Sequence, residues 1–158
     1  MVDLPGPAEP TVVRRVFETW SIEVPASFAE TFVAADSYWH GYDDHRSVSL
    51  TSLHVTDKGR PVSAERISRQ LPPLDGLPVD ELPPGLIGRA ARIATVKSAR
   101  ASQALSGLLA TEGRLLIVTI TGDDLEWTQR VWRSIRNLSA PFLGQGRRRA
   151  HSDGRRVR

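Results

Sequence analysis

The sequence predicts an α+β domain in which an antiparallel β-sheet of about six strands is flanked by helices, with a C-terminal helix packed on the sheet. Residues 20–24 and 46–55 alternate apolar and polar side chains, which is the period of half-buried strands. Residues 114–121 are apolar on both faces, as a central strand is. A helix capped by Asp123 or Thr121 is expected to follow. Its apolar face comprises Trp127, Val131, Ile135 and Leu138.

The composition fits one globular domain. The chain has 158 residues, of which 40% are hydrophobic and 25% are charged. It is therefore long enough to bury its own core and too apolar to be disordered throughout. It contains no cysteine, which excludes a disulfide scaffold, a thiolate metal site and a cysteine nucleophile.

The positive charge is concentrated at the C-terminus. Residues 144–158 hold six of the 21 basic residues and one of the 18 acidic residues, so the net charge of +3 comes from this tail. We divide the chain into a flexible N-terminal lead (1–10), a single α+β domain (11–143) and a basic disordered tail (144–158). The sequence shows no signal peptide and no apolar stretch of membrane-spanning length. We therefore expect a cytoplasmic protein without a membrane contact.

The domain is expected to begin with a β-hairpin. Residues 12–17 and 20–24 are rich in β-forming side chains and predict two strands joined by a tight turn. Ser27 and Glu30 match a capping box, in which each side chain bonds a free backbone amide at a helix start. A short helix over residues 28–35 is therefore predicted.

Two strands and a second short helix are expected next. The strands fall over residues 38–42 and 46–55. Ser63 is placed to cap a helix over residues 64–71, which two prolines then end. The long loop 72–85 is rich in proline and acidic residues, and loops of this length are usually functional or disordered.

The segment 86–111 allows two interpretations. Its alanines suit one long helix, but Gly88 and Gly107 would weaken a helix interior. We favour two strands, near 88–96 and 100–110, joined around Lys97 and Ser98.

Five segments occur in an order that is typical of one fold family. They are Trp-Ser-Ile-Glu-Val-Pro (20–25), Arg-Ser-Val-Ser-Leu-Thr-Ser (46–52), Leu-Ser-Gly-Leu-Leu (105–109), Leu-Leu-Ile-Val-Thr-Ile-Thr (115–121) and Asp-Asp-Leu-Glu-Trp (123–127). In this order, over roughly residues 12–138, the chain resembles bacterial members of the Mog/PsbP-like fold family. The resemblance implies an α/β/α sandwich and a non-enzymatic role in binding or assembly. It carries no functional residue over to this chain.

The richest local chemistry lies in residues 38–46. Tyrosine, tryptophan and arginine are enriched at interaction hot spots, and this segment gathers Tyr38, Trp39, Tyr42 and Arg46. We predict that these four residues bind a partner protein, on a surface to which the acidic loop 72–85 can contribute. The other interpretation, in which the aromatic side chains belong to the core, stays open.

The same segment allows a metal-dependent hydrolase centred on His40 and His45. Asp43 and Asp44 stand between the two histidines, but the spacing matches no established ligand pattern. A hydrolytic triad of His40, Asp44 and a serine lacks the G-x-S-x-G turn that presents the nucleophile. The candidate serines are Ser47, Ser49 and Ser52. We expect neither a metal nor another cofactor.

The tail offers a further alternative. Its arginines can attract nucleic acid or an acidic partner through long-range electrostatics. The residues concerned are Arg147, Arg148, Arg149, Arg155 and Arg156. The leading hypothesis remains a non-enzymatic protein-binding or assembly-factor domain, whose partner the sequence does not identify.

Overall fold

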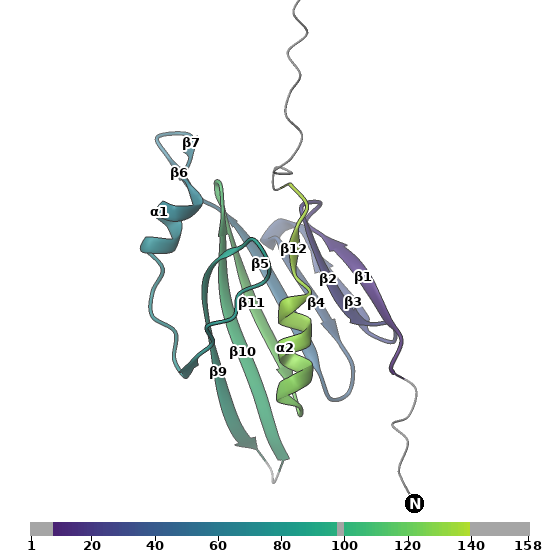
Figure 1. Ribbon diagram of the computed structural model, residues 1–158. Coiled ribbons are helices and arrows are strands. Elements are labelled where there is room, and N and C mark those ends of the chain that lie inside the picture. Colours follow the sequence, from purple (N-terminus) through teal and green to yellow (C-terminus); the bar gives the residue numbers. More distant parts are fainter. Residues whose placement is uncertain (1–7, 98–99, 140–158) are drawn as a thin grey trace, which may run out of the picture.

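A seven-stranded antiparallel sheet forms the centre of the fold in the computed structural model, which describes residues 8–97 and 100–139 (Figure 1). The strand order is β3-β4-β5-β11-β10-β9-β8. In that order the strands are Ala29–Val33, Tyr38–Tyr42, Ser47–His54, Arg114–Gly122, Arg100–Thr111, Ile87–Lys97 and Leu77–Pro78. β11 lies fourth of the seven strands, so the prediction of a central strand at residues 114–121 is confirmed.

A smaller sheet lies on one face of the large one. β1 (Thr11–Val16) and β2 (Trp20–Pro25) form the predicted hairpin, and β12 (Arg136–Asn137) pairs with the other side of β2. The remaining short elements are η1 (Ala34–Asp36), β6 (Thr56–Asp57) and β7 (Arg60–Pro61). β1 is consequently an edge of the small sheet, just as β3 is an edge of the large one.

The core lies between the large sheet and a layer made of the small sheet and α2 (Leu125–Arg133). Figure 1 shows α2 lying over β10 and β11, which it contacts. Trp20 and Trp132 are the largest fully buried side chains. Gly107 of β10 makes room for Trp132, because a Cβ there would lie 2.2 Å from the indole ring. This close approach explains a glycine in the middle of a long strand.

The other face of the large sheet is covered only in part. α1 (Ala64–Arg69) packs Ile67 against Leu108 of β10. The Ser63 Oγ accepts a hydrogen bond from the Arg66 amide at 3.2 Å, so the predicted cap of this helix is confirmed. Over β3, β4, β5 and the adjoining part of β11, every side chain on this face is half-buried or exposed. We call this uncovered region the open face.

The fold contains more strand and less helix than the sequence predicts. The large sheet has seven strands instead of about six. The two α-helices have six and nine residues, so each covers only part of one face. The two-strand interpretation of residues 86–111 is confirmed, since β9 and β10 pair from Ile87 opposite Ala110 to Lys97 opposite Arg100. Over the described residues, no helix is long and apolar enough to span a membrane.

The predicted helix over residues 28–35 is wrong. β3 occupies its centre and pairs with β4 along five residues. The Glu30 side chain forms an ion pair with Arg14 of β1 at 3.0 Å, where the capping box would have turned it back toward Ser27. Phe28 is buried against Trp127. Tertiary packing and strand pairing thus override a local helix signal.

The C-terminal helix is confirmed, with different ends. Its N-cap is Asp124, whose carboxylate accepts from the Glu126 amide at 2.9 Å, and neither Asp123 nor Thr121 caps it. Because the helix ends at Arg133, Leu138 does not share its apolar face and is exposed.

Candidate functional site

β4 sorts the predicted binding residues onto different faces. Adjacent residues of a strand point to opposite faces, and Trp39 points into the core, where it is 4% exposed. Tyr38 and Tyr42 point to the open face, and Tyr42 is 39% exposed. The prediction that Trp39 lies on the binding surface is therefore wrong. The alternation that exposes its neighbours buries its own side chain.

Tyr38, His40 and Tyr42 form a row of rings on the open face, which we call the aromatic row. The ring centroids of His40 and Tyr42 are 4.9 Å apart, with an angle of 24° between the ring planes. Those of Tyr38 and His40 are 6.2 Å apart. The Tyr38 hydroxyl and the Ser49 Oγ lie 3.3 Å apart, within hydrogen-bond distance. The rings brace one another, so the row is a rigid amphipathic surface that loses little entropy on binding.

Hydroxyl-bearing side chains flank the aromatic row on the neighbouring strands. The register places Thr31 of β3 and Ser49 of β5 on either side of His40, and Thr119 of β11 beside Ser49. Each hydroxyl can donate and accept a hydrogen bond. This arrangement suits the polar groups of a protein partner, which need both donors and acceptors opposite them.

Arg46 is engaged in ion pairs within the fold. Its Nη1 donates to Glu9 Oε2 at 2.7 Å, and its Nε donates to Asp43 Oδ2 at 3.0 Å. The guanidinium also lies 5.0 Å from the centre of the Trp127 ring. Its donors are thus occupied within the chain, and it ties the segment before β1 to the turn after β4.

The pKa values of the two carboxyl groups reflect this contact. Hydrogen bonding from Arg46 holds the pKa of Glu9 below its ordinary value. Burial raises the pKa of Asp43, but hydrogen bonds from the Arg46 side chain and from the His45 and Arg46 amides outweigh it and lower the pKa overall.

The two histidines stand in different surroundings. His40 belongs to the aromatic row, whereas His45 lies in the turn after β4, where its amide donates to Asp43 Oδ1 at 2.9 Å. Within residues 8–97 and 100–139, no three His, Asp or Glu side chains are grouped so that they could hold a metal ion. Ser52, one of the candidate serines, points into the core.

The acidic loop 72–85 lies at the edge of the large sheet opposite to β3. It contains β8, whereas β4 is the second strand from the opposite edge. The Trp132 Nε1 donates to the Glu81 backbone oxygen at 2.8 Å, and Arg133 pairs with the Glu81 carboxylate at 2.8 Å. The loop therefore fastens onto α2. This corrects the expectation that it shares a surface with Tyr38 and Tyr42.

A free sheet edge, which the sequence does not predict, lies beside the aromatic row. Among the strands that the structure describes, β3 has a partner on one side only, and β1 is the edge of the small sheet. A groove of about 560 Å³ runs between them; we call it the edge groove. Its lining residues are Val13, Arg14, Arg15, Val16, Phe17, Glu30, Phe32 and Trp39. The β-forming run Thr31-Phe32-Val33 is a sequence signal for a strand here, but the capping-box pattern at the same place favours a helix.

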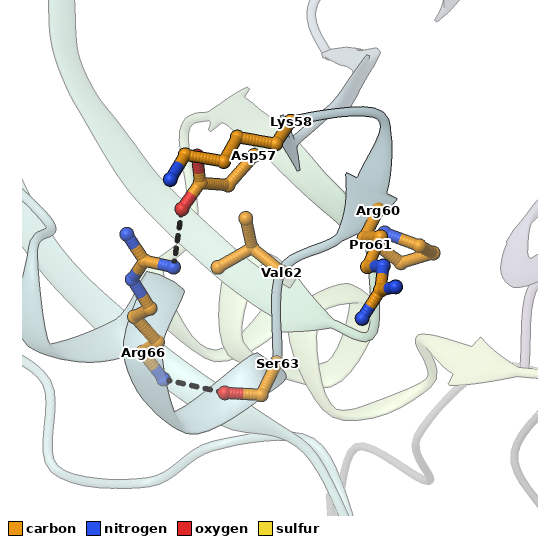
Figure 2. Close-up of a pocket in the computed structure, with 7 residues that line it drawn as sticks. All are labelled: Asp57, Lys58, Arg60, Pro61, Val62, Ser63 and Arg66. Atoms are coloured by element: carbon orange, nitrogen blue, oxygen red, sulfur yellow. Dashed lines mark hydrogen bonds and ion pairs between the residues drawn. The ribbon is translucent and has the colours of Figure 1, made fainter.

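A second hollow, of about 510 Å³, lies between α1 and the β6–β7 turn (Figure 2). Figure 2 shows the Arg66 side chain reaching Asp57, and the Nη1–Oδ2 distance is 3.0 Å. The polar side chains that line it are exposed and carry both signs of charge. Such a hollow favours no particular ligand. The tail arginines from Arg147 to Arg156 lie outside the described residues, so their contact with nucleic acid stays a prediction.

Comparison with known proteins gives the fold alone. No protein-family model and no curated protein matches the chain. Among solved structures it is similar to a crystal structure from Bacteroides thetaiotaomicron VPI-5482 at 1.50 Å resolution, with a TM-score of 0.54 and 6% sequence identity. The match covers 82% of this chain and 48% of that one, so this chain spans about half the length of that protein.

Proposed function

We propose that the chain is a non-enzymatic protein-binding domain, as its resemblance to the Mog/PsbP-like fold family implies. The proposed surface is the corner of the large sheet where the aromatic row meets β3. The observation that carries the proposal is the position of the aromatic row on the open face: three mutually braced rings stand where every side chain is half-buried or exposed. Tyrosine in such a position is the residue type that dominates binding energy at protein interfaces.

The surroundings of the row also favour binding over catalysis. Its neighbours are hydroxyl groups, and the nearby Asp43 carboxylate is occupied by Arg46. A general acid–base pair needs a second titratable group within hydrogen-bond reach of the reacting atoms. The open face provides a partner with hydrogen-bonding groups and apolar ring surface instead.

The test is affinity capture with the tagged full-length chain from its native host, followed by measurement of Kd with the purified partner. We expect Tyr42→Ala to weaken binding about tenfold or more, the effect of losing an interface hot spot. Leu77→Ala is the matched control, because Leu77 is an exposed apolar residue of β8, at the opposite edge of the large sheet. Equal Kd values for the two variants, with unchanged melting temperatures, would contradict the proposal.

Deleting residues 144–158 distinguishes binding by the folded domain from binding by the arginine-rich tail. The positive charge gathered there favours an electrostatic contact, and such a contact weakens steeply as salt rises. A partner that binds the truncated chain with an unchanged Kd belongs to the folded domain. A partner or nucleic acid lost with the tail belongs to the arginines.

A further inference from the structure

We propose that β3 accepts an extended segment of the partner protein as an eighth strand of the large sheet. This inference rests on the protein-binding function proposed above and adds the way in which the partner binds. The juxtaposition that carries it is a free strand edge with the aromatic row on one side of the sheet and the edge groove on the other.

The backbone of β3 has the features of a receptive edge. All five residues of β3 are exposed, and they pair with β4 in an unbroken register, so no bulge twists the edge away. The strand contains neither proline nor lysine. An edge strand presents unpaired N–H and C=O groups at alternate residues, and proteins usually blunt such edges with proline, charged side chains or a bulge. The one charged side chain of β3, Glu30, is neutralised by its ion pair with Arg14. Strand addition uses these groups for affinity.

The side chains of β3 place binding surface on both sides of an added strand. Thr31 and Val33 share the open face with the aromatic row, because they pair with His40 and Tyr38. Phe32, which is 57% exposed, lines the edge groove and lies 6.0 Å from Phe17 between ring centroids. An added strand therefore directs alternate side chains onto the aromatic row and into the groove.

The charges of the edge groove specify the chemistry of the added strand. Arg14 is paired with Glu30 across the groove at 3.0 Å. Arg15 lines the same groove and is exposed, and it pairs with no carboxylate of the described residues. The occupant we infer carries an apolar side chain over Phe32 and a carboxylate that reaches Arg15. Pairing with the β3 of a second copy would bring only Glu30 to this edge, and Arg14 already holds Glu30. The proposed occupant is therefore a segment of another protein.

The test uses a displayed library of random linear peptides selected on the immobilised full-length chain. Enriched peptides are synthesised, and their Kd is measured for the wild type and for Phe32→Lys. Leu77→Lys is the matched control, because Leu77 is 61% exposed on β8, the opposite edge of the same sheet. We expect enriched peptides in which one residue separates an apolar residue from an acidic residue, so that both of these side chains face the edge groove. We expect Phe32→Lys to weaken their binding at least tenfold and Leu77→Lys to leave it unchanged.

Hydrogen exchange on the wild type gives a readout that needs no variant. Peptide binding should slow exchange at alternate amides of β3. Absence of enriched peptides, equal binding by the two lysine variants, or slowed exchange elsewhere would overturn the inference. A dimer in sedimentation that Phe32→Lys disperses would assign the edge to a second copy and overturn it too. If the captured partner depends on Tyr42 but not on Phe32, the protein-binding function stands and strand addition fails.

Discussion

The two edges of the large sheet differ in length and in protection. β8 has two residues, one of them a proline, and the loop that continues from it is fastened to Trp132 through the Glu81 backbone. β3 has five exposed residues and no proline. The β8 edge is thus short, and its loop is held by hydrogen bonding to the fold, whereas the β3 edge is longer and free. Because unprotected edges invite association, the contrast supports the proposal that a partner segment adds to β3.

The largest expected effect on stability comes from removing Trp132, which holds the loop after β8. Trp132→Ala should lower the free energy of unfolding by about 3–5 kcal/mol, the usual cost of deleting a buried tryptophan. The indole fills the space over Gly107 and holds the loop through Glu81. Denaturant unfolding of the full chain measures the change.

The matching change at the free edge is Phe32→Ala. Because Phe32 is exposed, we expect it to alter the free energy of unfolding by no more than about 0.5 kcal/mol. A cost as large as that of Trp132→Ala would show that Phe32 is part of the core, and it would remove the contrast between the edges.

The effect expected from Arg46→Met lies between those of Trp132→Ala and Phe32→Ala. It leaves the Glu9 and Asp43 carboxylates without their partner, and we expect a loss of about 1–2 kcal/mol at neutral pH because both lie near the surface. The pKa values of both groups are lowered by folding, so their stabilisation is present above the ordinary values of 4.5 and 3.8 and is lost as the pH falls below them. The difference from the wild type should therefore shrink in acid.

Arg130→Met is the control for this pH dependence. Arg130 forms an exposed helix pair with Glu126 at 3.5 Å, and such pairs contribute little. We expect its unfolding curves to follow the wild type at neutral and acid pH. A difference for Arg46→Met that stays constant as the pH falls would show that its cost is loss of packing on Trp127 and not loss of charge pairing.

Strand periodicity and turn residues predict most of this fold. The hairpin at the start, the central strand and the helix capped by Ser63 are confirmed, because each follows from local sequence. The helix over residues 28–35 is wrong because its capping signal is local, whereas pairing with β4 and burial of Phe28 are not. Free edges are not predictable in this way, since an edge is defined by which strands fail to pair.

In the candidate site, too, local features are predictable from the sequence and long-range contacts are not. Alternation along β4 predicts that neighbours of a buried residue are exposed, but the sequence does not say whether Trp39 or its neighbours face the core. The engagement of Arg46 depends on Glu9, which lies 37 residues earlier in the chain. Only the assembled sheet shows that the acidic loop and the aromatic row lie near opposite edges.

The last change tests whether Pro78 keeps β8 from accepting an added strand. Pro78→Val frees the backbone in the unfolded chain and should lower the free energy of unfolding by about 0.4–1 kcal/mol. It also gives β8 a new backbone N–H, so proline no longer blocks that edge. We expect the peptides selected on the wild type to remain unbound by the double variant Phe32→Lys/Pro78→Val, because two residues give an added strand too few hydrogen bonds. If the double variant bound these peptides and the amides of β8 then exchanged more slowly, the proline, and not the short length of β8, would explain why the two edges differ.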